Sequence, residues 1–376
     1  MKVRIGDICT SFSGFTPAAS DLFPSGKYPY FKVAEMNREA NQRVMTDTDA
    51  YVKDSRKFFP KGAIVFPKNG AAIATNKKRI LGQDSIVDLN TAGVKPNTDI
   101  ISTEYLFYLF QNIDFAQYMR RGAVPTLDLK SILALEIDLP SLADQQRIVA
   151  ELDLLSGIVE KKNAQLKTLD DLAQSIFYEM FGDVEEKTPL STYVTELSGG
   201  KSLAGDEENQ YKVLKTGAVT FDYFRGDDVK NLPLDYIPRE EDRVKKGDLL
   251  ISRMNTAELV GAVAYVWDVK PNIYLPDRLW RVSLTEAANP IFIWKALIQF
   301  DAKQQIRSLA SGTSGTMKNI SKPKLLSITI PKSSREKQDS FAQRLRAIQS
   351  QRNCIEESKK VAAVLFASRM DKYFNV

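Results

Sequence analysis

The chain has 376 residues, 43% hydrophobic and 26% charged, a composition typical of a folded protein with room for more than one core. Its net charge of +5 is mildly basic, and its two cysteines, Cys9 and Cys354, are too far apart in sequence to suggest a metal site. Histidine is absent, which excludes hydrolases built on a Ser–His or Cys–His pair. The N-terminus has no apolar run of signal-peptide length, and no segment approaches membrane-spanning length. We therefore expect a cytoplasmic protein without membrane contact.

The first part of the chain, to about residue 140, alternates Gly and Pro with short β-rich runs. Apolar residues at helical spacing after a Ser/Thr cap predict a helix over 103–117. Basic residues concentrate between Lys53 and Arg79, where Asp54 is the only acidic residue, so we expect a positive face. The predicted strands are 30–33, 63–66, 72–74 and 135–139.

A long amphipathic helix follows. From Ile148 to Met180 its apolar residues alternate at spacings of four and three, interrupted only by Lys162, which is the pattern of a coiled-coil seam. A stripe of this length exceeds what one small domain can cover, so we expect a second helix to pack against it. The alternative is that each long helix packs on its own domain.

The second half repeats this order. Its predicted strands are 211–214, 248–252, 261–267 and 327–330, with a helix over 290–300. A second long helix follows, and its seam is weaker because it contains Arg352, Lys359 and Arg369.

The two halves share a framework. A short strand ends in Pro, a polar turn leads to Gln145 or Gln338, and a long helix closes on Phe181 or Phe374. The repeat of about 190 residues is too long for a solenoid and fits a duplicated domain. We expect an α+β protein in which two similar mixed α/β domains are joined by two long helices that form an antiparallel coiled coil, with pseudo-twofold symmetry. The predicted segments are 1–141, 142–182, 183–332 and 333–376.

The helix residues predicted to form the coiled coil or contact partners share the repeated framework or the seam. They are Gln145, Ile148, Leu152, Leu155, Val159, Leu166, Leu169, Phe181, Gln338, Phe341, Leu345, Ile348, Ile355, Phe366 and Phe374.

Enzymatic motifs are scarce. Asn289-Pro290-Ile291-Phe292 resembles the Asn-Pro-Pro-aromatic motif of amino-methyltransferases only distantly, and Pro at the first turn of a helix explains it. The loop 311–315 could hold a phosphate with its backbone N–H groups, or could be a plain flexible loop. It lacks the Gly-Lys-Thr of a nucleotide P-loop.

Basic and amide residues that share a turn are candidates for contacts with phosphates or base edges, and solvated loops are the alternative. The candidates are Lys68, Asn69, Asn76, Lys77, Lys78 and Arg79 in the first half, and Lys215, Thr216, Arg253, Asn255, Arg278, Thr313, Ser314, Lys318 and Asn319 in the second. Their recurrence in both halves favours a nucleic-acid interface.

The chain resembles the specificity (S) subunit of type I restriction–modification systems over essentially its full length. The resemblance rests on the Leu-Pro…Gln-Gln-Arg-Ile helix, its second copy and the segments 61–79 and 246–281. This resemblance implies two target recognition domains, each reading half of a split double-stranded DNA sequence, with the helices as spacers. It also implies two modification (methyltransferase) subunits bound around the spacers and restriction (motor nuclease) subunits in the full complex. S-adenosylmethionine and all catalysis would belong to those partners, with no metal or cofactor bound by this chain. The chain is compact for this family, and the polar turn at 332–336 departs from the first copy.

Two other functions remain open from the residues alone. One is a non-catalytic scaffold with two adaptor domains that bind proteins. The other is an enzyme whose site has no recognised motif.

Overall fold

The computed structural model describes residues 1–120, 122–314 and 317–374. The chain divides into two compact units. Unit 1 comprises residues 1–164 with 356–376, and unit 2 comprises 165–355. Each unit therefore contains one globular domain and part of each long helix, and each is described by itself.

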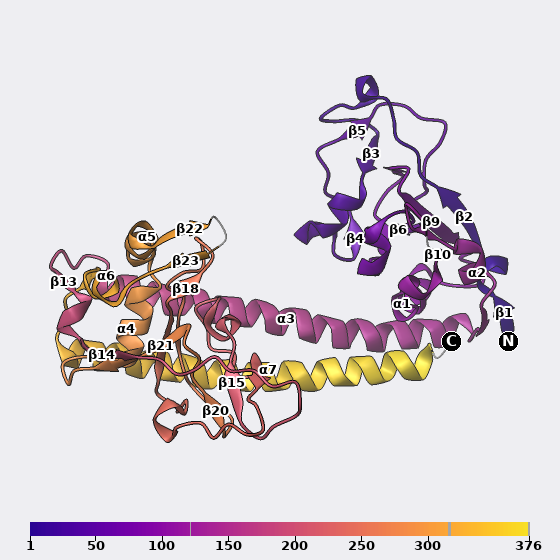
Figure 1. Cartoon of the computed structure of the whole chain (residues 1–376). Helices are drawn as coiled ribbons and strands as arrows, with labels where there is room; N and C mark the ends of the chain where they lie inside the picture. The colour runs from indigo at the N-terminus through magenta and orange to yellow at the C-terminus, as the bar shows by residue number, and fades with distance from the viewer. Residues whose placement is uncertain (121, 315–316, 375–376) are drawn as a thin grey trace. The chain divides into compact units, whose positions relative to one another are not determined.

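The domain of unit 1 contains a five-stranded sheet in the order β2-β9-β6-β7-β4 and a three-stranded sheet in the order β5-β3-β8 (Figure 1). The bounds are β2 Cys9–Ser13, β3 Tyr28–Phe31, β4 Val44–Met45, β5 Tyr51–Val52, β6 Ile64–Pro67, β7 Arg79–Leu81, β8 Ile86–Val87 and β9 Thr91–Pro96. The central strand β6 is wholly buried and pairs antiparallel with β7 and β9. Two short pairs complete the domain, formed by β1 Lys2–Arg4 with β12 Glu136–Asp138 and by β10 Met119–Arg120 with β11 Thr126–Leu127.

Helix α1, Thr103–Asn112, covers the core of unit 1, and Ser102 caps its N-terminus by accepting from the N–H of Tyr105. The predicted helix over 103–117 is therefore too long. After Asn112 the chain turns, and Asp114 caps a separate 3-10 helix that places Phe115 edge-on against Phe66. The predicted strand 72–74 is wrong, because these residues lie in a 3-10 helix, Ala71–Thr75. The short helix α2, Leu129–Leu133, precedes β12.

The domain of unit 2 has a four-stranded sheet, β14-β21-β17-β19, and two three-stranded sheets, β16-β15-β20 and β18-β23-β22. The bounds are β14 Val194–Ser198, β15 Lys212–Leu214, β16 Val229–Asn231, β17 Leu249–Ser252, β18 Met254–Asn255, β19 Val263–Tyr265, β20 Ile273–Tyr274, β21 Leu279–Leu284, β22 Ser311–Ser314 and β23 Met317–Asn319. The pair β13 Lys187–Pro189 and β24 Thr329–Pro331 corresponds to β1 and β12. The remaining helices are α4 Pro290–Leu297, α5 Phe300–Leu309 and α6 Lys322–Leu326.

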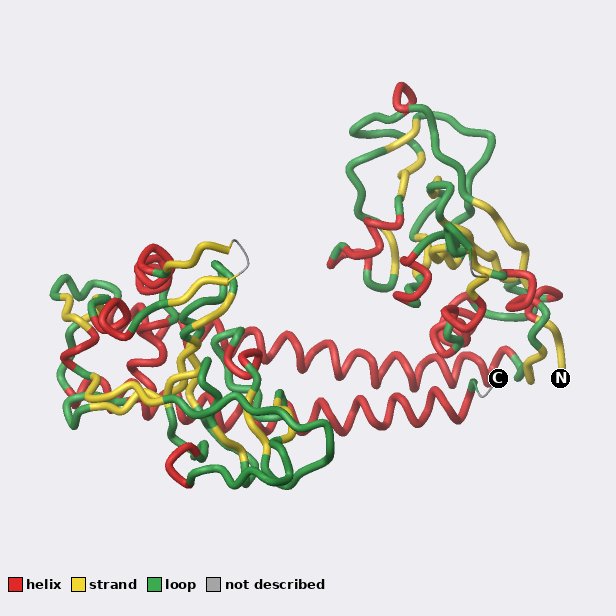
Figure 2. Tube along the Cα trace, in the orientation of Figure 1, coloured by secondary structure: helices red, strands yellow, loops and turns green. Residues whose placement is uncertain are grey.

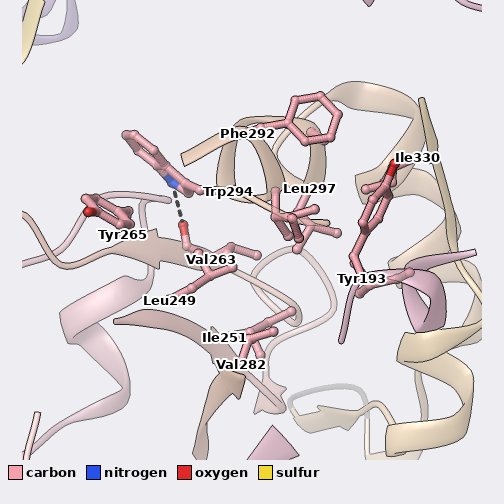
Figure 3. Packing of buried hydrophobic residues seen from close by; sticks show 14 of the residues in the cluster. Tyr193, Leu249, Ile251, Val263, Tyr265, Val282, Phe292, Trp294, Leu297 and Ile330 are labelled. Atoms are coloured by element: carbon pink, nitrogen blue, oxygen red, sulfur yellow. Dashed lines mark hydrogen bonds between the residues drawn. The ribbon is translucent and has the colours of Figure 1, made fainter. Parts of the chain in front are cut away.

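Helix α4 packs its apolar face on this sheet. Figure 3 shows Phe292, Trp294 and Leu297 of α4 above the strand residues Ile251 and Val263, with the Trp294 indole N–H donating to the Val263 carbonyl at 3.2 Å. The sequence predicted one helix over 290–300. It ends at Leu297, and a second helix, α5, was missed because little of its surface is apolar.

The long helices are α3, Leu142–Phe181, and α7, Arg335–Tyr373, drawn as long red coils in Figure 2. They run antiparallel within each unit. In unit 1, Glu151 accepts from Tyr373 at 2.6 Å and pairs with Arg369, and in unit 2, Asp170 pairs with Arg352. The predicted α+β fold with two long helices is confirmed. Leu152, Leu155, Leu166, Leu169, Phe341 and Leu345 are buried, whereas Val159, Ile348, Ile355 and Phe366 are half-buried.

The ends of both helices enter the domain cores. Phe374, which directly follows α7, packs on Tyr105 of α1, with ring centroids 5.0 Å apart, and its carbonyl accepts from the Asn112 side chain at 2.7 Å. In unit 2, Phe181 of α3 packs on Phe292 of α4 at 4.8 Å. Each domain core is thus closed by the helix that ends beside it. No described helix is long and apolar enough to span a membrane.

Candidate nucleic-acid interface

In each domain a basic residue follows directly after an interior strand of the main sheet, at the same structural position. After β6, the Lys68 N–H donates to the Asn90 carbonyl, and the Lys68 carbonyl accepts from Leu127, both at 2.8 Å. After β17, the Arg253 N–H donates to the Arg278 carbonyl at 3.1 Å, and the Arg253 carbonyl accepts from Ile320 at 3.0 Å. Matching hydrogen bonds therefore fix both backbones where the strand meets its loops.

In unit 2 this geometry gathers most of the residues predicted from sequence. The strand β18 pairs with β23 so that Asn255 lies opposite Lys318 and Met254 opposite Asn319. Arg253, which immediately precedes β18, is hydrogen-bonded through its backbone N–H to the carbonyl of Arg278, the residue before β21. Residues about 65 positions apart in the chain thus form one basic and amide-rich surface.

The Arg253 side chain is held against an aromatic ring. Its guanidinium carbon lies 5.7 Å from the centroid of the buried Trp280 ring, a cation–π contact, and the Lys322 ammonium approaches the same ring at 5.9 Å. The Nε atom of Arg253 is buried and has no hydrogen-bond partner among the described residues. By contrast, Arg239 and Arg281 of the same domain are paired with Asp242 and Asp248.

A cavity of about 390 Å³ lies beside this surface. Its lining includes Lys215, Thr216 and Arg278, each of which was predicted from sequence as a DNA contact. It also includes Lys230, which was not predicted. Lys230 was missed because its place depends on the pairing of β15 with β16, where Val213 lies opposite Lys230. Three cationic side chains and a hydroxyl around one cavity provide the donors that suit a phosphate group. Its full lining is Ser202, Leu214, Lys215, Thr216, Lys230, Pro276, Asp277 and Arg278.

The corresponding position in unit 1 has fewer charged side chains. The Lys68 ammonium donates to the Ser13 hydroxyl at 2.9 Å, and the Asn69 amide donates to the Asn90 side-chain oxygen at 3.3 Å. Asn90 occupies the place of Arg278, and no basic cluster in the sequence pointed to it. The two domains therefore present different chemistry at the same position of a shared scaffold.

The prediction that Lys78 and Arg79 contact DNA is corrected, because both side chains are buried. The Lys78 ammonium donates to the Ile113 carbonyl at 2.8 Å and to the Asn76 side-chain oxygen at 2.5 Å, and it lies 4.1 Å from the Phe115 ring centroid. Arg79 donates to the Met36 carbonyl at 3.0 Å. Burial lowers the pKa of Lys78 to about 7.

The neighbouring candidates Asn76 and Lys77 also make contacts within the domain. Asn76 adopts a left-handed conformation, with φ of 52°, and its side-chain oxygen accepts from the Phe115 N–H at 2.9 Å. Asn76 therefore stabilises this turn. Lys77 is half-buried and its ammonium donates to the Asn37 side chain.

The candidates Thr313 and Ser314 lie in β22, but their side chains, like residue 315, are outside what the structure describes. No geometric role is assigned to them.

Two of the residues predicted to face partners, Gln145 and Gln338, are instead fully buried in their own units. The Gln145 side chain accepts from the Ser102 N–H at 2.9 Å and donates to the carbonyls of Ile100 and Pro140. Gln338 makes the same three bonds with Asn289, Ala287 and Ser333. These glutamines fasten each long helix to the N-terminus of α1 or α4.

Residues 1–168 match the family model described as type I restriction modification DNA specificity domain. The type I restriction enzyme HindI specificity subunit of Haemophilus influenzae is 24% identical over 216 residues, which cover 54% of this chain and 44% of that protein. The chain thus spans less than half the length of the curated relatives it matches.

Two solved structures align over the whole chain. The type I restriction–modification S subunit from M. genitalium matches with a TM-score of 0.61 at 14% identity, covering 100% of this chain and 96% of that one. A structure from work on complex assembly and conformational transition of the type I R-M system matches with a TM-score of 0.55 at 18% identity, covering 100% and 97%. These two matches show a shared fold.

The duplicated domain and the two long helices are the fold that this chain shares with the two solved S-subunit structures. The resemblance to the S subunits of type I restriction–modification systems is confirmed, and residues 1–168 form a type I restriction modification DNA specificity domain.

Proposed function

We propose that this chain is the DNA-reading subunit of a type I restriction–modification complex, with each domain recognising one half of a bipartite double-stranded target. The observation that carries the proposal is the shared strand-end position, where Lys68 in one domain and Arg253 in the other are fixed by the same backbone hydrogen bonds. Basic side chains at such positions can neutralise phosphates and reach base edges in the major groove.

The two half-sites differ in sequence. Lys68 is accompanied by Asn69 and Asn90, whereas Arg253 is accompanied by Arg278 and Lys318. Because amides and guanidinium groups favour different base edges, different residues on a common scaffold select different bases. The target is therefore asymmetric, and the long helices set the gap between its halves.

Catalysis belongs to the partners in this proposal. Two modification subunits bind around the long helices and carry S-adenosylmethionine, and restriction subunits join the full complex. A chain without histidine lacks the commonest general base, which agrees with a subunit that reads DNA and does not modify it.

Titration against duplex DNA of random sequence tests this function. The chain, alone and with its modification subunits, should bind with an affinity that falls steeply with salt, because phosphate contacts release counterions. A protein-binding scaffold would show no such affinity in either form. Methyl transfer by the chain alone, given DNA and S-adenosylmethionine, would contradict the assignment of catalysis to the partners.

A further inference from the structure

The surface of unit 2 contains two kinds of cationic group, and their geometry separates them. Lys215, Lys230 and Arg278 line a cavity, whereas the Arg253 guanidinium lies over the buried Trp280 ring beside it, 5.7 Å from the ring centroid. We infer that Arg253 reads a guanine in the half-site of the second domain, while the cavity holds a neighbouring backbone phosphate. This inference rests on the proposed function and assigns the residue that determines specificity.

The first reason is that Arg253 is fixed in place. Its N–H and its carbonyl are hydrogen-bonded to two different segments, at Arg278 and Ile320, and its guanidinium group makes a cation–π contact with Trp280. An arginine held in this way loses less conformational entropy on binding than a free side chain would.

The second reason is that its donors are available. In the part of the chain that the structure describes, Arg253 forms no ion pair and its side chain donates no hydrogen bond, and the Nε atom is the only one of its three nitrogens that is buried without a partner. The two terminal nitrogens therefore reach solvent. Two parallel N–H donors match the O6 and N7 acceptors that guanine presents in the major groove.

The third reason is the chemistry of its surroundings. The cavity suits a phosphate better, because three cationic side chains and the Thr216 hydroxyl, from three separate places in the chain, line it and can contact one anion. The Arg278 backbone links the cavity to Arg253, so a phosphate held there fixes the register of the base that Arg253 meets. Asn255 and Lys318 extend the same edge and can contact the next base pair.

The test uses the chain expressed with its modification subunits in a host that lacks other methylation, with single-molecule sequencing of the methylated bases. The wild-type complex must first give a split methylation motif. If it gives none, the proposed function is contradicted, and this outcome is distinct from failure of the inference about Arg253. Arg253→Ala should then lose discrimination at one G·C position of one half-site, by about 5- to 150-fold for one bidentate contact. The gap and the other half-site should not change.

Arg253→Lys keeps the charge and the fold, and it separates reading a base from binding a phosphate. If Arg253 reads guanine, the lysine variant relaxes the same position, because an ammonium group lacks the planar pair of donors. Full recovery of the wild-type motif and rate by Arg253→Lys would overturn the inference. A uniform fall in methylation with an unchanged motif in Arg253→Ala would overturn it as well. Lys246→Ala, in the exposed turn that precedes the same strand, is the matched control and should leave the motif intact.

Discussion

The side-chain oxygen of Gln338 accepts the backbone N–H of Asn289 at 2.8 Å, and Asn289 is the residue that caps α4. The start of the long helix α7 is thereby tied to the first turn of the helix that covers the domain core. Gln145 repeats this arrangement in unit 1 with Ser102, the cap of α1. The most conspicuous residue of the duplicated sequence framework is thus a joint between a helix and its domain.

Replacing Gln338 by Leu should destabilise unit 2 by about 2–4 kcal/mol, because three hydrogen bonds to the backbone would be lost and the buried N–H of Asn289 would be left without a partner. All three tryptophans of the chain, Trp267, Trp280 and Trp294, lie in unit 2, so denaturant unfolding followed by tryptophan fluorescence measures this loss of stability. Gln343→Leu changes an exposed glutamine on the same helix and should cost little. Equal destabilisation in the two variants would refute the role given to Gln338.

Unit 1 should become more stable as the pH rises from 7 towards 10. Burial lowers the pKa of Lys78 from 10.5 to about 7, so in this range the unfolded chain binds a proton that the folded chain does not. The free energy of unfolding therefore gains up to about 1.4 kcal/mol per pH unit relative to Lys78→Met, and the gain disappears as the pH falls to 7. Denaturant unfolding followed by circular dichroism compares the two proteins, and parallel pH profiles would contradict the prediction.

Neutralising the cavity of unit 2 should weaken binding to every DNA sequence alike. Lys215→Ala combined with Lys230→Ala should reduce the slope of log affinity against log salt by about 0.9 for each phosphate that is no longer neutralised. Fluorescence anisotropy with random duplex DNA at several salt concentrations measures this slope. Lys245→Ala combined with Lys246→Ala removes the same charge outside the cavity, and an equal change in that control would show that the effect is not local.

Lengthening both long helices should lengthen the gap of the DNA target. Four residues added to each helix, after Ala164 in α3 and after Ile355 in α7, extend each by about 6 Å, which is roughly two base-pair steps. Methylation sequencing should report the same two half-sites with a wider gap. A change in either half-site would contradict the idea that helix length sets spacing alone.

The long helices could be predicted from sequence because the heptad pattern from Ile148 to Met180 is a local signal that tertiary contacts do not override. The extent of α1 could not, because Phe115 belongs to the same apolar set as the helix yet folds back onto Phe66. Similarly, the 3-10 helix at Ala71–Thr75 has the composition of a short buried strand.

The candidate interface was partly predictable. The sequence pattern identified Arg253, Arg278 and Lys318 as candidates because they are basic residues. It could not show that they lie close together, because that depends on the pairing of β17, β18, β21 and β23. The prediction that Lys78 contacts DNA rested on its charge alone and was wrong, because its ammonium donates a hydrogen bond inside unit 1. In unit 2, a buried lysine from α5, Lys303, similarly donates to the Gly261 carbonyl at 3.0 Å. Which lysines turn inward is decided by the turns they stabilise, and those turns are set by contacts distant in sequence.

The most direct measurement of the central claim is the methylation motif that this chain imposes on its modification subunits. Single-molecule sequencing of DNA methylated by the assembled complex should give two unlike half-sites separated by a gap of fixed length. When the residues at the strand end of one domain are changed, only the half-site of that domain should change. A single continuous motif, or methylation that does not depend on this chain, would contradict the account.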